Sequence, residues 1–308
     1  MRPIRLALVG LGKVARDQHI PALAVSPNFE LVCGATIEGR CPAGATYPSI
    51  EAMLEAEPAI EAVALCQPPQ ARFEAARTAL AAGKHVLLEK PPGTTVGELS
   101  VLADMARDRG LSLFAAWHSR FSAGVEPAKA WLQNRDILSV RVIWREDVRV
   151  WHPGQQWIWR PGGLGVFDPG INALSIATWI LPPLRFVEGE LAYPGNRQAP
   201  IAAELVMEVA GGGRLTADFD FRQTGPQIWD IHILTDGGSL LLGKGGERLS
   251  IDGKPQAVAT AAEYPALYTR FAELIGRGES EVDSRPLQLT ADAFLGSSRT
   301  TLEPFEYA

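Results

Sequence analysis

The sequence predicts an α/β protein with two domains: an N-terminal doubly wound parallel sheet and a C-terminal α+β domain with an open, mostly antiparallel sheet. Three observations support this. Short apolar runs alternate with helix patterns up to about residue 120, a glycine-rich turn follows the first run, and longer alternating runs separated by glycine turns come later. The length of 308 residues suits two domains. We place them at 1–120 and 121–308, and leave open whether the C-terminal helices pack back on the first.

Five short apolar runs in the N-terminal part predict buried parallel strands, because helices cover both faces of such a sheet. These runs are residues 4–10, 29–36, 60–66, 84–90 and 111–117. Helical patterns that end at a glycine lie between them at 71–83 and 96–110. The alternation of strand and helix predicts the doubly wound arrangement.

The C-terminal part has a different pattern. A helix at 125–134 leads into a long alternating run at 137–150, and an apolar helix follows near 171–181. Turn signals then predict hairpins of an antiparallel sheet. They lie at 211–213, 236–238, 243–246 and 252–253. The chain returns to helix at 264–278 and in a last segment near 287–300.

The composition restricts the class of partner. A formal net charge of −6 argues against nucleic acid or an anionic membrane. The three cysteines have no disulfide or metal-ligand spacing, which indicates a reducing compartment and no metal site. No apolar stretch reaches the length of about 18 residues that a membrane span needs. We expect a cytoplasmic protein that acts on a small molecule.

The turn after the first strand, VGLGKVA, places Gly10, Gly12 and Ala15 in a G-x-G-x-x-A pattern between a strand and a helix. Gly10 allows the tight turn, Gly12 lets the backbone approach a pyrophosphate, and the helix N-terminus faces its charge. We expect these glycines, with Lys13 and Val14, to bind a dinucleotide in a Rossmann domain. The alternative is a strand–helix turn without a ligand.

The end of the second strand predicts the cofactor preference. An acidic residue there would hold the ribose hydroxyls and repel a 2′-phosphate, but the position holds Thr36, followed by Ile37. Thr36 can hydrogen-bond a phosphate and Arg40 lies near it in sequence, which favours NADP. Because Glu38 could reach the ribose, use of NAD stays open.

Two further strand ends should line the cofactor crevice, since an open parallel sheet binds its ligand at the carboxyl ends of its strands. Cys66, Gln67 and Pro68 follow the third strand, and Glu89 and Lys90 follow the fourth. We expect all five to contact the cofactor. The alternatives are a plain proline turn and a surface lysine.

Several motifs resemble the glucose–fructose oxidoreductase, inositol dehydrogenase and rhizopine-catabolism family, and the resemblance covers almost the whole chain. The motifs are LLEKPPG, DQHIPAL, WHSRF, WIWRPGGLGVFDPGIN and the C-terminal helix. The resemblance implies a nicotinamide-dependent oxidoreductase of sugars or polyols. It also implies a homodimer or larger assembly through the C-terminal sheet, whose domain would bind the substrate.

Within that family, longer stretches are similar to the bacterial group of L-arabinose and D-galactose 1-dehydrogenases. They are GKVARDQHIPA, WHPGQQWIW and GGLGVFDPGINALSI. This implies oxidation of the C1 hydroxyl of an aldopyranose of the L-arabinose, D-galactose or D-fucose type to the aldonolactone. The sequence does not choose among these sugars.

The motif VFDPGIN places a carboxylate, Asp168, and an amide, Asn172, one turn apart in an apolar stretch. With a helix starting near Pro169, Asp168 would cap it. The family usually has a histidine where this chain has Asn172, so a mechanism that uses that histidine as base does not transfer. We expect Asp168 to accept the proton, Lys90 to polarise the sugar oxygen, and Asn172 to hold a hydroxyl. The exchange of the first two roles stays open.

Five further residues are expected at the substrate or cofactor from the resemblance. Glu146 and His152 suit a polyol, and Trp151 can stack on the apolar face of a pyranose. His118 ends the last parallel strand, and Arg160 follows a tryptophan in a Trp-Arg pair that reaches the cofactor or substrate in the family. The alternatives are ordinary solvated or packed residues.

Two other functions stay open. The chain could be another sugar or polyol oxidoreductase of the family, such as an inositol dehydrogenase. It could also be a regulator that binds a dinucleotide without turning it over, although such a protein would not need both Lys90 and Asp168, and the chain has both.

Overall fold

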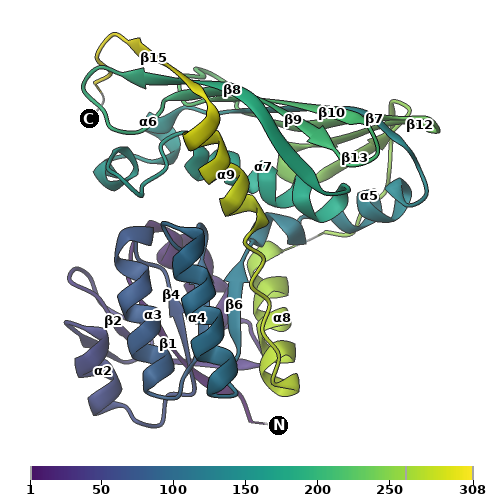
Figure 1. Ribbon diagram of the computed structural model, residues 1–308. Coiled ribbons are helices and arrows are strands. Elements are labelled where there is room, and N and C mark those ends of the chain that lie inside the picture. The colour runs from purple at the N-terminus through teal and green to yellow at the C-terminus, as the bar shows by residue number, and fades with distance from the viewer. Residues whose placement is uncertain (1, 261, 307–308) are drawn as a thin grey trace. The chain divides into compact units, whose positions relative to one another are not determined.

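The computed structural model describes residues 2–260 and 262–306. Contacts divide the chain into two units (Figure 1). The first holds residues 1–118 and 262–284, and the second holds 119–261 and 285–308. The first unit therefore contains a late segment that the sequence boundary at residue 120 would give to the second.

A six-stranded parallel sheet forms the centre of the first unit, in the order β3-β2-β1-β4-β5-β6. Its strands are β1 (Ile4–Val9), β2 (Phe29–Ala35), β3 (Ala45–Tyr47), β4 (Ala62–Leu65), β5 (His85–Glu89) and β6 (Leu113–Ala116). The five predicted strands are confirmed with shorter bounds. Strand β3 was not predicted, because three residues are too few to show a period.

Helices flank this sheet (Figure 1). They are a π-helical turn (Ala15–His19) that continues into α1 (Ile20–Ala24), α2 (Ile50–Ala56), a 3₁₀ turn (Pro69–Ala71), α3 (Arg72–Ala81), α4 (Val96–Asp108) and α8 (Glu263–Arg277). A further 3₁₀ turn (His118–Phe121) follows β6 where the chain passes from the first unit to the second. Helix α4 begins in a capping box, in which Thr95 accepts from the Glu98 N–H and the Glu98 side chain accepts from the Thr95 N–H.

The buried face of α8 explains why a late segment belongs to the first unit. Phe271 stacks on Phe29 of β2, with ring centroids 5.6 Å apart, and on Phe114 of β6 at 6.1 Å. All three rings are almost fully buried. Burial of aromatic rings stabilises by roughly 2 kcal/mol each, so the sheet and this helix form one core.

The second unit contains a nine-stranded sheet in the order β14-β13-β12-β11-β7-β10-β9-β8-β15. Its strands are β7 (Ile137–Arg145), β8 (Leu184–Pro194), β9 (Ala202–Val209), β10 (Gly213–Asp220), β11 (Ile228–Thr235), β12 (Gly238–Gly243), β13 (Arg248–Ile251), β14 (Lys254–Pro255) and β15 (Ser298–Leu302). The β7–β10 and β8–β15 pairs are parallel and the others are antiparallel, so the mostly antiparallel sheet is confirmed.

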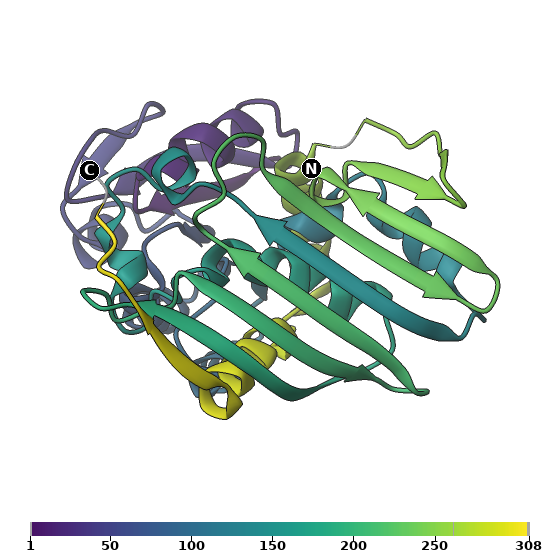
Figure 2. The ribbon, with the colours of Figure 1, turned by 90° about the horizontal axis from the view of Figure 1, so that it is seen from above.

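Helices cover one face of this sheet. They are α5 (Val125–Leu132), α6 (Val148–Trp151), a 3₁₀ turn (Gln156–Trp159), α7 (Phe167–Ile180), a 3₁₀ turn (Lys244–Gly246) and α9 (Arg285–Gly296). Seen in Figure 2, the sheet turns its other face to the viewer, and no helix of this unit crosses that face in the described part of the chain.

Three sequence predictions in this unit need correction. The run 137–150 is a strand only to Arg145; Asp147 then accepts a hydrogen bond from the Arg149 N–H at 3.0 Å and begins helix α6. The segment 287–300 is helical only to Gly296 and ends as an edge strand. Helix α7 starts at Phe167, so Asp168 lies in its first turn and does not cap it.

No helix among residues 2–260 and 262–306 is long and apolar enough to cross a membrane.

Candidate active site

The glycine turn of the first unit has the geometry that a dinucleotide requires. Gly10 has φ +85°, and a Cβ there would lie 2.8 Å from the Gln67 nitrogen, so a larger residue is excluded. A Cβ on Gly12 would meet no protein atom within 4 Å. The Arg16 N–H donates to the Gly12 carbonyl at 3.1 Å, which starts a helical run whose first N–H groups belong to Lys13 and Val14. Because these amides have no intrahelical partner, they can hold a pyrophosphate.

The turn after β2 gathers the residues expected to read the ribose. The Thr36 hydroxyl donates to the Glu38 carbonyl at 2.7 Å and accepts from the Glu38 N–H at 3.3 Å. Ile37 is 93% exposed, and Arg40 is exposed as well. The turn therefore presents a hydroxyl, a carboxylate and a guanidinium from one short segment.

The ends of β4 and β5 lie beside each other in the sheet, with Leu65 paired to Leu88. Cys66 is a buried free thiol, while Pro68 is exposed. The side-chain oxygen of Gln67 is buried without a hydrogen-bond partner among the described residues. A buried amide oxygen of this kind is the feature expected where a ligand donor binds.

Lys90 follows β5, and charged neighbours fix its main chain. Its N–H donates to Oε2 of Glu89 at 2.6 Å. The Arg72 guanidinium donates to the carbonyls of Glu89 and Pro91, on either side of Lys90, and to that of Gln67. The Lys90–Pro91 peptide bond is cis.

Glu89, the last residue of β5, has partners that lie far away in the chain. It is 1% exposed, and its Oε1 accepts from the Tyr264 hydroxyl at 2.6 Å and lies 3.2 Å from Nε2 of His19. Nδ1 of the same histidine lies 2.7 Å from the Tyr268 hydroxyl. The carboxylate therefore belongs to a buried network, and the expected contact of Glu89 with the cofactor stays a prediction.

The buried His19–Glu89 pair is charged. Burial raises the pKa of Glu89, but hydrogen bonds and charge from His19, with His118 and Tyr264, outweigh it and hold the pKa at about 2. Burial opposes protonation of His19, yet Cys66, Tyr268 and Glu89 together raise its pKa well above the ordinary range. The sequence alone does not reveal this network, because its members are up to 249 residues apart.

His118 lies half-buried in the 3₁₀ turn that follows the last parallel strand, β6. Its Nδ1 lies 2.6 Å from Oε2 of Glu263, and its ring stacks on Tyr264 with centroids 5.3 Å apart. Both partners come from α8, so this late helix orients the imidazole.

In the second unit, an imidazole lies between two buried carboxylates. Nε2 of His152 is 3.1 Å from Oε1 of Glu146, and its Nδ1 is 3.7 Å from Oδ2 of Asp168. The side chains of Glu146 and Asp168 are 4% and 3% exposed, against 13% for His152. Glu146 follows β7, His152 follows α6, and Asp168 lies in the first turn of α7. The fold therefore gathers residues that lie up to 22 positions apart.

Two tryptophans, Trp151 and Trp229, adjoin this cluster, and only Trp151 is among the residues predicted from the sequence. The Trp229 indole donates to Oε2 of Glu146 at 3.0 Å, and its ring lies 4.9 Å from that of Trp151. Trp229 lies on β11, opposite Trp144 of β7. The sequence shows that Trp229 lies in a strand-like run. Its contact with Glu146 depends on the register in which β11 pairs with β7.

The remaining expected residues lie close to this cluster in the chain. Asn172 is half-buried on α7, one turn after Asp168, and its carbonyl accepts from the Ser175 hydroxyl at 2.7 Å. Arg160 is exposed, whereas the preceding Trp159 is buried against Phe221, with ring centroids 5.8 Å apart.

The structure thus gathers the expected residues in two groups, one within each unit. The first holds the glycine turn, the β2 turn and the ends of β4, β5 and β6; the second holds the Glu146–His152–Asp168 cluster with Trp151 and Asn172. Among the residues that the structure describes, no three His, Cys, Asp or Glu side chains group as metal ligands.

The chain resembles known proteins over its whole length. A family model described as oxidoreductase family, NAD-binding Rossmann fold, matches residues 4–116. The chain is 47% identical over 306 residues to a galactose 1-dehydrogenase of Pseudomonas fluorescens, covering 99% of each. The crystal structure of a D-galactose-1-dehydrogenase from Rhizobium etli matches with a TM-score of 0.95 and 54% identity, covering 99% of each chain.

A more distant structure shares the fold alone. It is a 3-ketoreductase from Actinomadura kijaniata in complex with NADP and TDP-benzene, with a TM-score of 0.86 and 20% identity over 97% of this chain and 99% of that one. The chain is 47% identical to a dehydrogenase over 99% of its length, and the Rossmann family model matches its N-terminal part. The protein is therefore an oxidoreductase enzyme and belongs to the glucose–fructose oxidoreductase, inositol dehydrogenase and rhizopine-catabolism family.

Proposed function

We propose that the chain oxidises the C1 hydroxyl of a galactose-type aldopyranose to the aldonolactone and transfers the hydride to NAD(P). One observation carries the proposal: a buried carboxylate–imidazole–carboxylate cluster flanked by two tryptophans lies in a chain 47% identical to a galactose 1-dehydrogenase over 99% of its length.

The cluster suits a sugar. A carboxylate has about four lone-pair positions, so Glu146 can accept from sugar hydroxyls while it also accepts from Trp229. The faces of Trp151 and Trp229 can pack on the apolar face of a pyranose, and such aromatic contacts contribute about 1 kcal/mol each.

Three side chains would serve the chemistry. When bound, the nicotinamide accepts the hydride from C1. Asp168 takes the hydroxyl proton, the Lys90 ammonium stabilises the negative charge that develops on the sugar oxygen, and Asn172 holds a neighbouring hydroxyl. The amide of Asn172 cannot carry a proton, which leaves proton transfer to the other residues.

The decisive experiment follows reduced nicotinamide by absorbance across a panel of aldoses and inositols. Lys90→Met and Asp168→Asn should each lower kcat by about 100-fold or more in folded protein. Near-normal turnover in both variants would overturn the proposal. Lys90→Arg separates the two assignments of the roles, because a guanidinium polarises an oxygen but accepts no proton.

The same panel tests the competing functions. Turnover of inositol but not of aldoses would indicate an inositol dehydrogenase. No increase in the absorbance of reduced nicotinamide with any substrate, together with tight cofactor binding, would indicate a regulator.

We propose NADP as the preferred cofactor, supported by Thr36 and exposed Arg40 at the end of β2. Arg40→Ala should raise KM for NADP about 10-fold and leave KM for NAD unchanged, since only NADP carries the 2′-phosphate. Equal changes for both cofactors would contradict the preference. The exposed Arg77→Ala on α3 is the control.

We propose that L-arabinose and D-fucose are accepted besides D-galactose. These sugars differ mainly at C5, and one small substituent changes recognition by only about 1–3 kcal/mol. Ratios of kcat/KM among them above about 200-fold would contradict this breadth.

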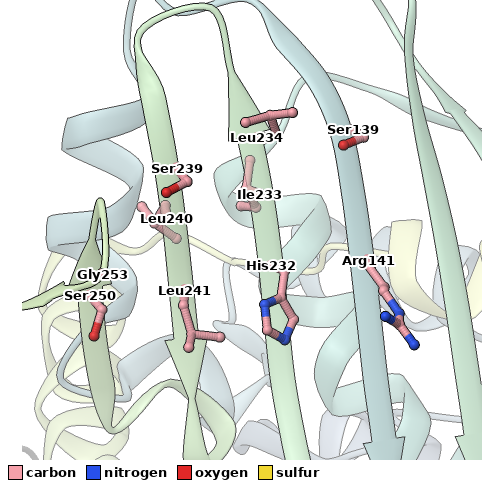
Figure 3. Close-up of a pocket in the computed structure, with 10 residues that line it drawn as sticks. All are labelled: Ser139, Arg141, His232, Ile233, Leu234, Ser239, Leu240, Leu241, Ser250 and Gly253. Atoms are coloured by element: carbon pink, nitrogen blue, oxygen red, sulfur yellow. The ribbon is translucent and has the colours of Figure 1, made fainter.

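We also propose a homodimer or larger assembly through the bare face of the second unit's sheet. A pocket of about 400 Å³ lies on that face, on β7, β11, β12 and β13 (Figure 3). It is lined by Ser139, Arg141, His232, Ile233, Leu234, Ser239, Leu240, Leu241, Ser250 and Gly253, none of which is an expected active-site residue. Of these lining residues, Leu234 is 48% exposed.

Sedimentation tests this assembly. The wild type should sediment as a dimer or larger, and Leu234→Glu should shift it toward monomer, because the variant introduces charge into the proposed interface. A monomeric wild type would contradict the proposal.

We further propose that the enzyme works in the cytoplasm. The three cysteines are all free and buried, which is consistent with a reducing compartment.

A further inference from the structure

The two nitrogens of His152 have different surroundings. Nε2 lies at hydrogen-bond distance, 3.1 Å, from Oε1 of Glu146, whose other oxygen accepts from Trp229. An ionised carboxylate only accepts, so Nε2 must donate to it. The interaction fixes the tautomer and leaves the Nδ1 lone pair as an acceptor when the imidazole is neutral.

Nδ1 faces a second acceptor. It is buried, has no hydrogen-bond partner among the described residues, and lies 3.7 Å from Oδ2 of Asp168. Two acceptors that face each other at this distance repel unless a proton lies on one of them or a donor reaches both. A sugar hydroxyl is such a donor.

From this geometry we infer that His152 is the store for the proton that the sugar releases, an inference that rests on the proposed function. The C1–H electron pair leaves for the nicotinamide, which is reduced, and the O–H electron pair forms the lactone carbonyl. The proton passes to Oδ2 of Asp168 and then to Nδ1 of His152. The sugar is oxidised by two electrons, and the proton ends on the imidazole.

The surrounding charges favour this end point. The imidazolium would lie between the carboxylates of Glu146 and Asp168, each almost fully buried, and opposite charge at that distance is effective away from water. Glu146 is held in turn by the Trp229 indole, so the arrangement orients and stabilises the imidazolium as the carboxylate of a Ser-His-Asp triad does. A proton on Nδ1 would turn the two facing acceptors into a donor and an acceptor.

Chemical rescue distinguishes proton storage from sugar binding. His152→Ala should lower kcat about 100-fold with KM for the sugar changed less, and added imidazole should restore at least about 10-fold of the loss. Imidazole should not raise the rate of the wild type. It should not rescue Asp168→Ala either, because that variant lacks a carboxylate and not an imidazole.

His152→Gln is the control for a folding defect in His152→Ala. Its amide can still donate a hydrogen bond to Glu146 but cannot take up a proton. It should retain the thermal midpoint and lose kcat like the alanine variant. Normal kcat in His152→Gln, or a raised KM without imidazole rescue in His152→Ala, would assign His152 to sugar binding and overturn this inference alone. A wild type that oxidises no aldose would overturn the proposed function and the inference with it.

Discussion

The backbone N–H of Lys90 donates to Oε2 of Glu89, the residue before it, across 2.6 Å. The other oxygen of that carboxylate meets the Tyr264 hydroxyl at 2.6 Å and Nε2 of His19 at 3.2 Å. A buried charge therefore anchors the main chain from which the Lys90 side chain extends.

Glu89→Gln should weaken both stability and catalysis. The substitution keeps the side-chain shape but leaves charged His19 without its buried partner, which should lower the free energy of unfolding by about 3 kcal/mol. Loss of the charged anchor at Lys90 should lower kcat about 10-fold and change KM for the cofactor less. Urea denaturation and steady-state kinetics measure the two effects.

The matched control for that experiment is Glu74→Gln on α3, whose exposed carboxylate pairs with Arg77 at the surface. Its urea midpoint should equal that of the wild type. If Glu89→Gln loses stability but keeps full kcat, the carboxylate does not position Lys90.

Stability should fall in acid because of Glu89. Its pKa is about 2 in the folded chain against an ordinary value of 4.5, so the unfolded state binds the proton more tightly. The stabilisation is complete above about pH 4.5 and is lost as the pH falls from there through about 2, and it amounts to about 3 kcal/mol. The raised pKa of His19 acts in the opposite sense: its contribution is complete below about pH 6.5 and is lost as the pH rises through its folded value.

Urea midpoints of the wild type and Glu89→Gln across the acidic range measure this effect. The gap between them should be widest near neutral pH and should narrow below about pH 4.5. A gap of constant size throughout that range would show that the charge of Glu89 is not responsible.

Trp229→Phe should weaken sugar binding. The variant keeps an aromatic face but removes the indole N–H that donates to Glu146, and a hydrogen bond to a charged group contributes about 1.5–3 kcal/mol. KM for the sugar should rise about 10-fold or more with KM for the cofactor unchanged. A KM for the sugar within twofold of wild type would show that Glu146 needs no such support.

Gly170→Ala should destabilise the second unit. A Cβ on Gly170 of α7 would lie 2.7 Å from a ring carbon of buried Phe219, so the helix or the ring must move at a cost of about 1–3 kcal/mol. The control is Gly276→Ala on α8, where a Cβ would meet nothing within 4 Å. That variant should gain up to about 1 kcal/mol from helix propensity. Urea denaturation that shows equal changes in both variants would contradict the packing argument.

The parts of the fold that sequence predicts are those specified by local patterns. The strand, turn and helix around Gly10 and Gly12 lie within a few residues of one another, so periodicity and turn chemistry suffice. The same holds for the glycine pair Gly211 and Gly212, which form a hairpin turn between β9 and β10 with φ +103° and +106°. Glu146, His152 and Asp168 were identified by residue type, but their mutual distances required the fold.

What sequence could not predict depends on distant partners. Glu89 was expected at the cofactor because it lies at a strand end, yet its carboxylate turns toward Tyr264, 175 residues later in the chain. Trp229 reaches Glu146 only because β11 pairs with β7 in one register, and a shift of one residue would move the indole to the other face. The start of α7 was placed too late because Pro169 suggests a first helical turn, whereas the helix begins two residues earlier.

The return of α8 to the first unit has a consequence for biosynthesis. The ribosome completes residues 1–118 early, whereas α8 is synthesised after every strand of the nine-stranded sheet except β15. Until then, the aromatic residues of α8 cannot contact their partners in residues 1–118, which are Phe29, Phe114, His19 and Glu89. Before α8 is made, the nascent N-terminal part therefore leaves Phe29 and Phe114 uncovered and the His19–Glu89 pair without its tyrosine partners. The chain can complete that half only when it is nearly finished, which ties maturation of the cofactor site to synthesis of almost the full polypeptide.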